Sequence, residues 1–222
     1  MDKRRIIIGE YDTAENGWTL SAWNFTSAQY KEHLVDKVGG DGAWDMSTVL
    51  SDGIPRYQNR TLTATLERSD GSRQNRETEI RSMVNALDGL QWQIYLPDDT
   101  ERYIVGRVSI VREYNDMAHA SVTVTAICEP WKYYQHNTER VFTVTTAAQT
   151  HYLFNNGRRA VVPVLTVEGA SASVLLEYGA ASRALSAGAY QVPDLLLTPG
   201  VHEIKVSGSG SLRITYREAV LE

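Results

Sequence analysis

The chain has few of the residues on which metal-dependent and disulfide-rich proteins depend. Only one of its 222 residues is a cysteine, Cys128, so a single chain can form neither an intramolecular disulfide framework nor a cysteine-based metal cluster. Its five histidines are widely separated, and none shows the His-x-x-x-His or Glu-x-x-His spacing of a metal site. Asp36, Asp41 and Asp45 lie near glycines but lack the spacing of a calcium loop. We therefore expect no metal, and we expect Cys128 to be a small buried hydrophobic residue.

Long hydrophobic runs are also missing. The longest apolar runs, such as residues 6–8 and 161–167, are far too short to cross a bilayer. The basic N-terminus is followed by only three isoleucines before Gly9, which is not the pattern of a secretion signal. The apolar content of 42% is nevertheless ordinary for a globular protein. These features predict a soluble protein without membrane insertion.

The common sequence signatures of enzymes are absent as well. The chain has no Gly-x-x-x-x-Gly-Lys-Ser/Thr phosphate loop, no Gly-x-Ser-x-Gly elbow and no dinucleotide fingerprint after a strand. Asp98, Asp99 and Glu101 could pair as general acid and base, but Pro97 to Thr100 has the composition of a hairpin turn. We expect no enzymatic activity and no cofactor.

Positive charge is scarce in the first part of the chain. The chain carries 22 basic and 27 acidic residues, for a net charge of −5. Residues 136–222 contain seven of each, which leaves 15 basic against 20 acidic residues in the first part. Tight binding of nucleic acid requires clustered cations, so this distribution argues against specific nucleic-acid binding. An acidic surface suits a pore through which DNA slides, and it equally suits an ordinary soluble surface.

Alternating residues predict mainly β-strands in the first part of the chain. In Thr61 to Glu67 the apolar side chains fall on every second residue, as in a half-buried strand, and Ser121 to Ala126 repeats the pattern. The predicted strands are 4–9, 18–23, 57–68, 91–96, 102–113 and 118–128.

A single amphipathic helix is predicted over Asn75 to Asp88. Apolar residues recur there at three- and four-residue spacing, which gives the helix one face for packing on a sheet. Asn75 is the expected N-cap, and Gly89 is expected to end the helix.

The second part of the chain shows many short strands and no helix. Residues 132–138 are polar and aromatic without periodicity, so we place a domain boundary there. Turn sequences such as Asn155-Asn156-Gly157, Glu168-Gly169 and Ser207-Gly208-Ser209-Gly210 separate the strands that follow. This pattern predicts a β-sandwich of jelly-roll type. The predicted strands are 140–145, 151–154, 160–167, 173–178, 182–185, 189–192, 201–206 and 211–216.

Residues 38–68 resemble the N-terminal domain of siphophage distal tail proteins, which form the hub of the tail tip. In that family a Gly-x-Asp-Gly-x-x-Asp turn precedes a Tyr-x-x-Arg strand. The residues that carry the resemblance are Gly39 or Gly40, Asp41, Gly42, Asp45, Tyr57 and Arg60. It continues in order through the helix, then Gly106-Arg107-Val108, then Glu129-Pro130-Trp131-Lys132-Tyr133-Tyr134. The later part is similar to the galectin-like sandwich that ends many of these proteins, through Asn156-Gly157, Pro163 and residues 208–217.

The resemblance implies two domains and a structural role. It implies a ring-forming domain at residues 1–135, of β-sandwich type with one α-helix and long hairpins, and a galectin-like or jelly-roll β-sandwich at residues 136–222. Six copies would form a hub ring with a lumen for DNA passage. The ring would join the tail tube protein to the tail-associated hub or tail fibre protein, and the sandwich would offer a platform for receptor-binding proteins. The protein would be made in the host cytoplasm and reside at the tail tip of the virion.

Six residues are candidates for contacts between subunits: Asp41, Trp44, Asp45, Tyr57, Arg60 and Arg107, the last as an ion-pair partner. Trp44 lies in a glycine-flanked loop where burial within its own chain is difficult, and tryptophans often anchor interfaces. The alternative is that these residues shape the loop of their own domain. A different function also stays open, that of a carbohydrate- or cell-surface-binding β-sandwich module. All five tryptophans lie in residues 1–135, so the sequence gives that alternative no direct support.

Overall fold

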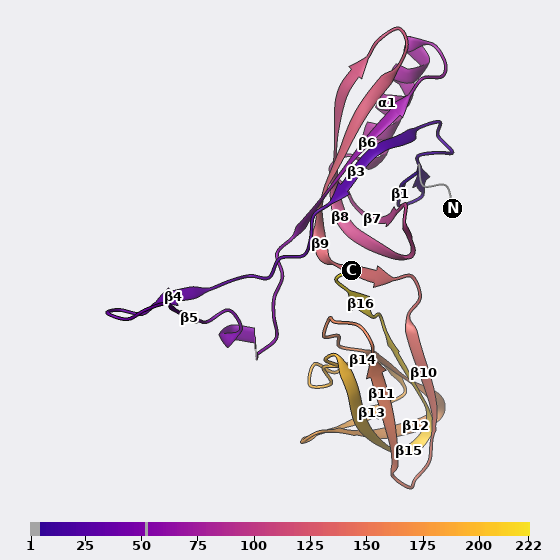
Figure 1. Ribbon diagram of the computed structural model, residues 1–222. Helices are drawn as coiled ribbons and strands as arrows, with labels where there is room; N and C mark the ends of the chain where they lie inside the picture. Colours follow the sequence, from indigo (N-terminus) through magenta and orange to yellow (C-terminus); the bar gives the residue numbers. More distant parts are fainter. Residues whose placement is uncertain (1–4, 52) are drawn as a thin grey trace. The chain divides into compact units, whose positions relative to one another are not determined.

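The computed structural model describes residues 5–51 and 53–222, and it is built mainly of β-strands (Figure 1). The part of the chain that it describes contains a single α-helix and one short 3₁₀ turn. The chain divides into two compact units, Met1–Pro130 (unit 1) and Trp131–Glu222 (unit 2). The predicted mainly-β, sandwich-type fold with one helix is confirmed. Within the described residues no helix is long and apolar enough to cross a membrane.

Unit 1 is built on one antiparallel sheet whose strands are not in sequence order. Strand β8 pairs with β9 on one side and with β7 on the other. β7 in turn pairs with the short strands of the N-terminus. The strand β16 (Ala219–Val220) pairs with the end of β9 that belongs to unit 2. The sheet order is β2 (Tyr11–Asp12), β1 (Ile7–Ile8), β7 (Gln91–Leu96), β8 (Asp99–Asn115), β9 (Ala120–Tyr134), β6 (Arg60–Arg68) and β3 (Thr19–Phe25).

The core of unit 1 lies on one face of this sheet, where the alternation of β6 and β9 places their apolar side chains. Leu62 pairs with Ala126, and Leu66 pairs with Val122, all four fully buried. The helix α1 (Arg73–Leu87) buries Ile80, Met83 and Leu87 in the same core. Burying one such apolar side chain stabilises a fold by about 1.5–3 kcal/mol, so this stripe fixes the helix to the sheet.

The predicted start of the helix is wrong by two residues. The N-cap is Ser72, whose Oγ accepts a hydrogen bond from the Asn75 backbone N–H at 3.2 Å. Asn75 is therefore not the N-cap: its backbone N–H is capped by Ser72, which has the extended backbone of a capping residue. The helix ends before Gly89 as predicted, and Gly89 has a φ of +74°.

A buried arginine ties the helix to two neighbouring turns. Arg76 is 1% exposed, although it lies in the first turns of a surface helix. Its guanidinium donates to the carbonyl oxygens of Gly71 at 2.7 Å and Asp116 at 2.9 Å. It therefore links the loop before α1 to the tip of the β8–β9 hairpin, 40 residues further along the chain.

We expect Arg76→Ala to destabilise unit 1 by about 3 kcal/mol, because a fully buried side chain and its charged hydrogen bonds to two turns are lost. The control is Arg81→Ala on the same helix, since the Arg81 side chain is 71% exposed. It should change stability little. Urea unfolding followed by tryptophan fluorescence reports mainly unit 1, because four of the five tryptophans lie there. Equal midpoints for both variants would contradict the role assigned to Arg76.

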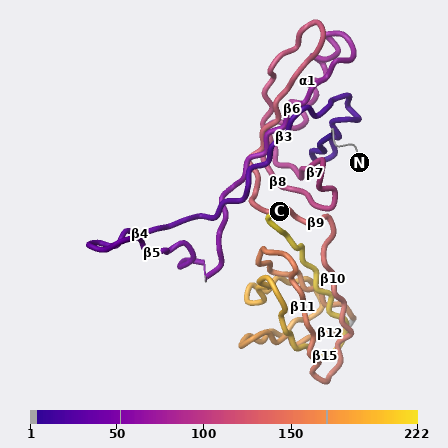
Figure 2. The backbone as a smooth tube through the Cα atoms, in the orientation of Figure 1, coloured from indigo at the N-terminus to yellow at the C-terminus, as the bar shows by residue number. Residues whose placement is uncertain are grey.

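Residues 26–59, which we call the arm, leave the sheet after β3 and return into β6 (Figure 2). At the base of the arm the Gln58 N–H donates to the Gln29 carbonyl at 2.7 Å. Tyr30 and Tyr57 form an isolated antiparallel β-bridge there. Beyond this base β4 (Leu34–Asp36) and β5 (Ala43–Asp45) form a separate two-stranded sheet, followed by the 3₁₀ turn Val49–Ser51. A two-stranded hairpin is marginally stable alone, so the arm depends on what it contacts.

Unit 2 is a sandwich in which two long strands run through both layers. The first half of β12 (Val164–Tyr178) pairs with β14, and its second half pairs with β13. Likewise β15 (Gly200–Tyr216) pairs with β11 in its first half and with β10 in its second half. Both halves bury side chains in one core. The remaining strands are β10 (Thr138–Val144), β11 (Gln149–Asn155), β13 (Ala181–Ser186) and β14 (Gly188–Gln191).

Two of the predicted turns in unit 2 are wrong, because they are bends inside these long strands. The predicted turn Ser207 to Gly210 lies within β15, and the predicted turn at Glu168-Gly169 lies within β12. Gly208 has a φ of +132°, and a Cβ there would lie 1.9 Å from the Ser173 carbonyl oxygen. Glycine serves here to let the paired strands β12 and β15 approach closely, and local sequence cannot separate that from a turn. Residues 132–138 also contain strand, since β9 continues to Tyr134.

We expect Gly208→Ala to destabilise unit 2 by about 3 kcal/mol or more, because the new methyl group overlaps a backbone oxygen. Gly179→Ala is the control: its φ is +56° and nothing lies within 4 Å of its Cβ position, so only about 1 kcal/mol of backbone strain is expected. Thermal unfolding by circular dichroism measures both. A similar loss in the two variants would contradict the close approach of β15 to β12 at Gly208.

Candidate functional site

Four of the six candidate interface residues lie on the arm, and two lie on the main sheet of unit 1. Asp41 is in the turn between β4 and β5, Trp44 and Asp45 are in β5, and Tyr57 is at the base of the arm. Arg60 begins β6, and Arg107 is in β8. The structure therefore brings Asp45 and Tyr57 to one hollow, leaves Asp41 at the tip of the hairpin, and keeps Arg60 and Arg107 on separate strands.

Trp44 is the largest side chain on an unusually exposed apolar surface. Its side chain is 61% exposed, and the Lys37 Nζ lies 4.8 Å from the centroid of its ring. The other exposed apolar residues of the arm are Tyr30, Leu34, Val35, Val38, Met46, Val49 and Leu50. Val38 and Leu50 are as exposed as in an extended peptide, at 104% and 101%. Exposed apolar patches of this kind mark interaction sites.

Asp45 organises the chain around Trp44. Its Oδ1 accepts a hydrogen bond from the Ser47 backbone N–H at 2.9 Å, and Ser47 Oγ accepts from the His33 N–H at 2.9 Å. The hydrogen bonds from Ser47 lower the pKa of the Asp45 carboxyl, so this group stays charged. Asp41 is exposed at the tip of the same hairpin. A hollow of about 320 Å³ next to Asp45 is lined by Tyr30 and Tyr57, among others.

Arg60 lies inside unit 1. It is 2% exposed, its Nε donates to the Thr26 carbonyl, and its guanidinium lies 3.8 Å from the centroid of the Phe25 ring. A second hydrogen bond reaches the Pro130 carbonyl at 3.5 Å. These contacts agree with the alternative that Arg60 shapes its own domain, because they fix the base of the arm to the sheet.

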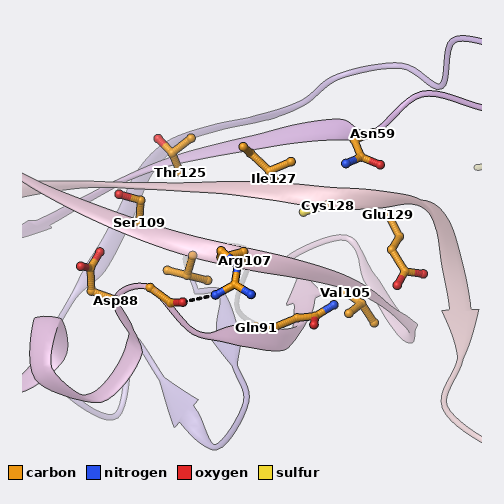
Figure 3. Close-up of a pocket in the computed structure, with 12 residues that line it drawn as sticks. Asn59, Asp88, Gln91, Val105, Arg107, Ser109, Thr125, Ile127, Cys128 and Glu129 are labelled. Carbon is orange, nitrogen blue, oxygen red and sulfur yellow. Dashed lines mark hydrogen bonds between the residues drawn. The ribbon is translucent and has the colours of Figure 1, made fainter.

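Arg107 is an exposed residue of β8 and borders a groove of about 550 Å³ (Figure 3). Its Nη1 donates to the Gly89 carbonyl. Figure 3 shows Arg107 between Asp88 and Gln91 on one wall, with Ile127 and Glu129 of β9 on the other wall. The groove, which we call the Arg107 groove, thus combines an apolar wall with charges of both signs.

The sheet face that carries this groove is rich in threonine. Thr63 pairs with Thr125, and Thr65 pairs with Thr123 across β6 and β9. Thr61 pairs with Ile127, which is 62% exposed. The predicted polar face of these two strands therefore forms one uncharged surface that ends at the groove.

Cys128 is buried, as expected, under the groove. It has no exposed surface, and burial raises the pKa of its thiol to about 12. β8 passes it at Gly106, where a Cβ would lie 2.5 Å from the Cys128 Sγ. Among the described residues no group of three or more His, Cys, Asp and Glu side chains could hold a metal ion.

We expect Cys128 to be inert toward thiol reagents in the folded protein at pH 8 and to react after unfolding, because the neutral buried thiol is a poor nucleophile. Titration with a chromogenic disulfide, with and without denaturant, measures this. Because the ordinary value of 9.0 lies below the folded value, unfolding releases a proton above pH 9, so stability should fall between pH 9 and pH 12. Rapid labelling of folded protein would contradict this burial.

The arrangement of strands in this chain is the fold of the siphophage distal tail proteins, which confirms the resemblance at the level of the fold. A solved structure with this fold is the Dit protein of phage SPP1, described as a paradigm of the hub adsorption apparatus in phages that infect Gram-positive bacteria. The similarity covers 97% of this chain and 98% of that chain, with a TM-score of 0.67 and 14% sequence identity. No family model and no curated protein sequence matches the chain.

Sequence reasoning missed the Arg107 groove and most of the apolar surface of the arm. The groove combines residues of β7, β8 and β9 with Asn59 and the end of α1, which lie far apart in the sequence. A usable signal exists for Ile127, because it is apolar at a position where the alternation of β9 predicts a polar residue.

Proposed function

We propose that this protein is a structural, non-enzymatic component of the tail tip of a siphophage or of a prophage. The observation that carries the proposal is the arm, which projects exposed apolar residues from a fold shared over 97% of the chain with a phage hub protein. A monomer gains nothing from exposing Trp44, Val38 and Leu50, whereas burial in an assembly stabilises them.

Six copies would form a closed hub ring through unit 1. The arm of each subunit, with Asp41, Trp44, Asp45 and Tyr57, would contact the next subunit, and Arg60 would hold the base of the arm. The excess of acidic residues in the first part of the chain would let DNA pass through the lumen without binding.

The ring would join the tail tube protein to the tail-associated hub protein or tail fibre protein. Unit 2 would serve as the platform for a receptor-binding protein, and the protein would reach the virion from the cytoplasm of the host. The fold and the arm support this role.

A carbohydrate- or cell-surface-binding role for unit 2 is the second candidate. Tyr152 and Phe154 point outward from β11, at 53% and 44% exposure, and aromatic faces of this kind bind sugars. A monomer that binds glycans saturably on an array, with loss of binding in Tyr152→Ala, would favour this function.

We expect light scattering over a concentration series to show a six-fold species of about 149 kDa, six times the 24.8 kDa chain. Negative-stain images should show rings. Trp44→Ala should weaken assembly about tenfold or more, because exposed aromatic anchors dominate interfaces. The control Tyr152→Ala removes an aromatic of similar exposure, 53% against 61%, from unit 2 and should leave the rings intact. A strict monomer at high concentration would overturn the ring.

A further inference from the structure

The connection between β14 and β15 of unit 2 is held to the sandwich through its backbone. Residues 192–199, which we call the strap, bury Leu195 and Leu197 in the core of unit 2. Within the strap the carbonyl oxygens of Leu196, Leu197 and Thr198 each lie within hydrogen-bond distance of a polar side chain of another element. These side chains are Tyr178 of β12, Asn155 of β11 and His202 of β15. One of the groups that hold the strap is therefore a titratable histidine.

His202 contacts the strap on one side and a tyrosine on the other. Its Nε2 lies 2.7 Å from the Thr198 carbonyl oxygen, and because a carbonyl oxygen only accepts, Nε2 carries a proton. Its Nδ1 lies 2.9 Å from the Tyr178 hydroxyl oxygen, and the same hydroxyl lies 3.2 Å from the Leu196 carbonyl oxygen. A chain of polar contacts thus leaves the strap at Leu196 and returns to it at Thr198.

The number of hydrogen bonds in this chain depends on the charge of His202. The Tyr178 hydroxyl has one proton, so beside a neutral imidazole it donates either to Nδ1 or to the Leu196 carbonyl. Beside an imidazolium, Nδ1–H donates to the hydroxyl, and the hydroxyl proton then goes to the carbonyl. Burial raises the pKa of the Tyr178 hydroxyl, so it keeps its proton over the range in which a histidine titrates. All three contacts are hydrogen bonds at once only when His202 is protonated.

Charged side chains of the elements around His202 have other partners or are exposed. Arg183 of β13 forms an ion pair with Asp194 of the strap at 2.6 Å. The guanidinium of Arg159, which follows β11, lies 5.4 Å from the centroid of the Tyr133 ring. The other titratable or charged side chains near the strap on β11, β12 and β15 are His151, which stacks on Phe142, and the exposed Tyr152, Glu177, Glu203 and Lys205. The tyrosine hydroxyl is therefore the titratable group in direct contact with the imidazole.

We propose that His202 is a pH-sensitive switch of unit 2, whose imidazolium form holds the strap more tightly than its neutral form. When Nδ1 takes up a proton from solvent, the Tyr178 hydroxyl turns its own proton from Nδ1 to the Leu196 carbonyl, and the strap gains a side-chain hydrogen bond. In the neutral form that carbonyl keeps only the backbone N–H of Thr198, at 3.2 Å. The inference uses contacts within unit 2 alone and does not rest on the proposed ring.

The sign of the pH dependence follows from where the extra hydrogen bond exists. It is made only in the folded protein with a protonated His202, so the folded state favours the bound proton. Its contribution to the stability of the strap is therefore present at acidic pH and is lost as the pH rises and His202 deprotonates.

Hydrogen–deuterium exchange of the full chain tests the switch. The Leu197 N–H, which donates to the Val161 carbonyl at 2.9 Å, reports opening of the strap. After correction for the intrinsic exchange rate, we expect peptides that cover the strap to be about threefold to tenfold better protected at about pH 5 than at about pH 8, the effect of one hydrogen bond. Equal protection at the two pH values would overturn the proposal.

Three variants assign the effect to the two side chains. His202→Gln removes the titrating ring, and Tyr178→Phe keeps the ring but removes the hydroxyl, so each should abolish the difference in protection. The matched control is His136→Gln, which removes an exposed histidine of the same unit and should keep the difference of the native protein. A difference that persists in Tyr178→Phe, or one that disappears in His136→Gln, would overturn the proposal. Circular dichroism at both pH values checks that each variant is folded, and either of the first two variants suffices if the other is not.

Discussion

The pairing of β6 with β9 is the constraint on which unit 1 depends. Each strand alternates apolar and polar residues, and their register places Leu62, Leu66, Val122 and Ala126 on one face. A shift of one residue would turn every buried side chain outward, so the register is strongly specified. The same register sets the other face, where the threonine pairs lead to the Arg107 groove. The same alternation of apolar and polar residues therefore builds the core on one face of the sheet and the candidate interface on the other.

Two buried arginines fix segments of unit 1 that lie outside the main sheet or at its ends. Arg60 fixes the base of the arm through Thr26 and Phe25, and Arg76 joins the loop before α1 to the tip of the β8–β9 hairpin. Both side chains are buried and donate to backbone carbonyls of neighbouring loops. Arg60 therefore fixes the base of the arm, and Arg76 fixes the tip of the β8–β9 hairpin.

The sequence predicted the features that are encoded locally. Burial repeats every second residue in β6 and β9 and every third or fourth residue in α1, so these elements were predictable. The remaining features depend on which distant segments pair or pack together, and local sequence does not encode that. Ser207 to Gly210 has the composition of a turn, yet it continues a strand because β12 pairs with it there. Arg60 was predictable as part of the motif, but its burial depends on Phe25 and Pro130, which other segments supply.

The two strands that run through both layers of unit 2 bear on how it carries mechanical load. β12 and β15 pair with each other in both halves, and each also pairs with an outer strand in each layer. Neither layer can separate while the other keeps its hydrogen bonds, because the same two strands belong to both. A load along the axis of β12 and β15 would act in shear on the hydrogen bonds between them. Both layers of unit 2 would share such a load, because the two strands belong to both.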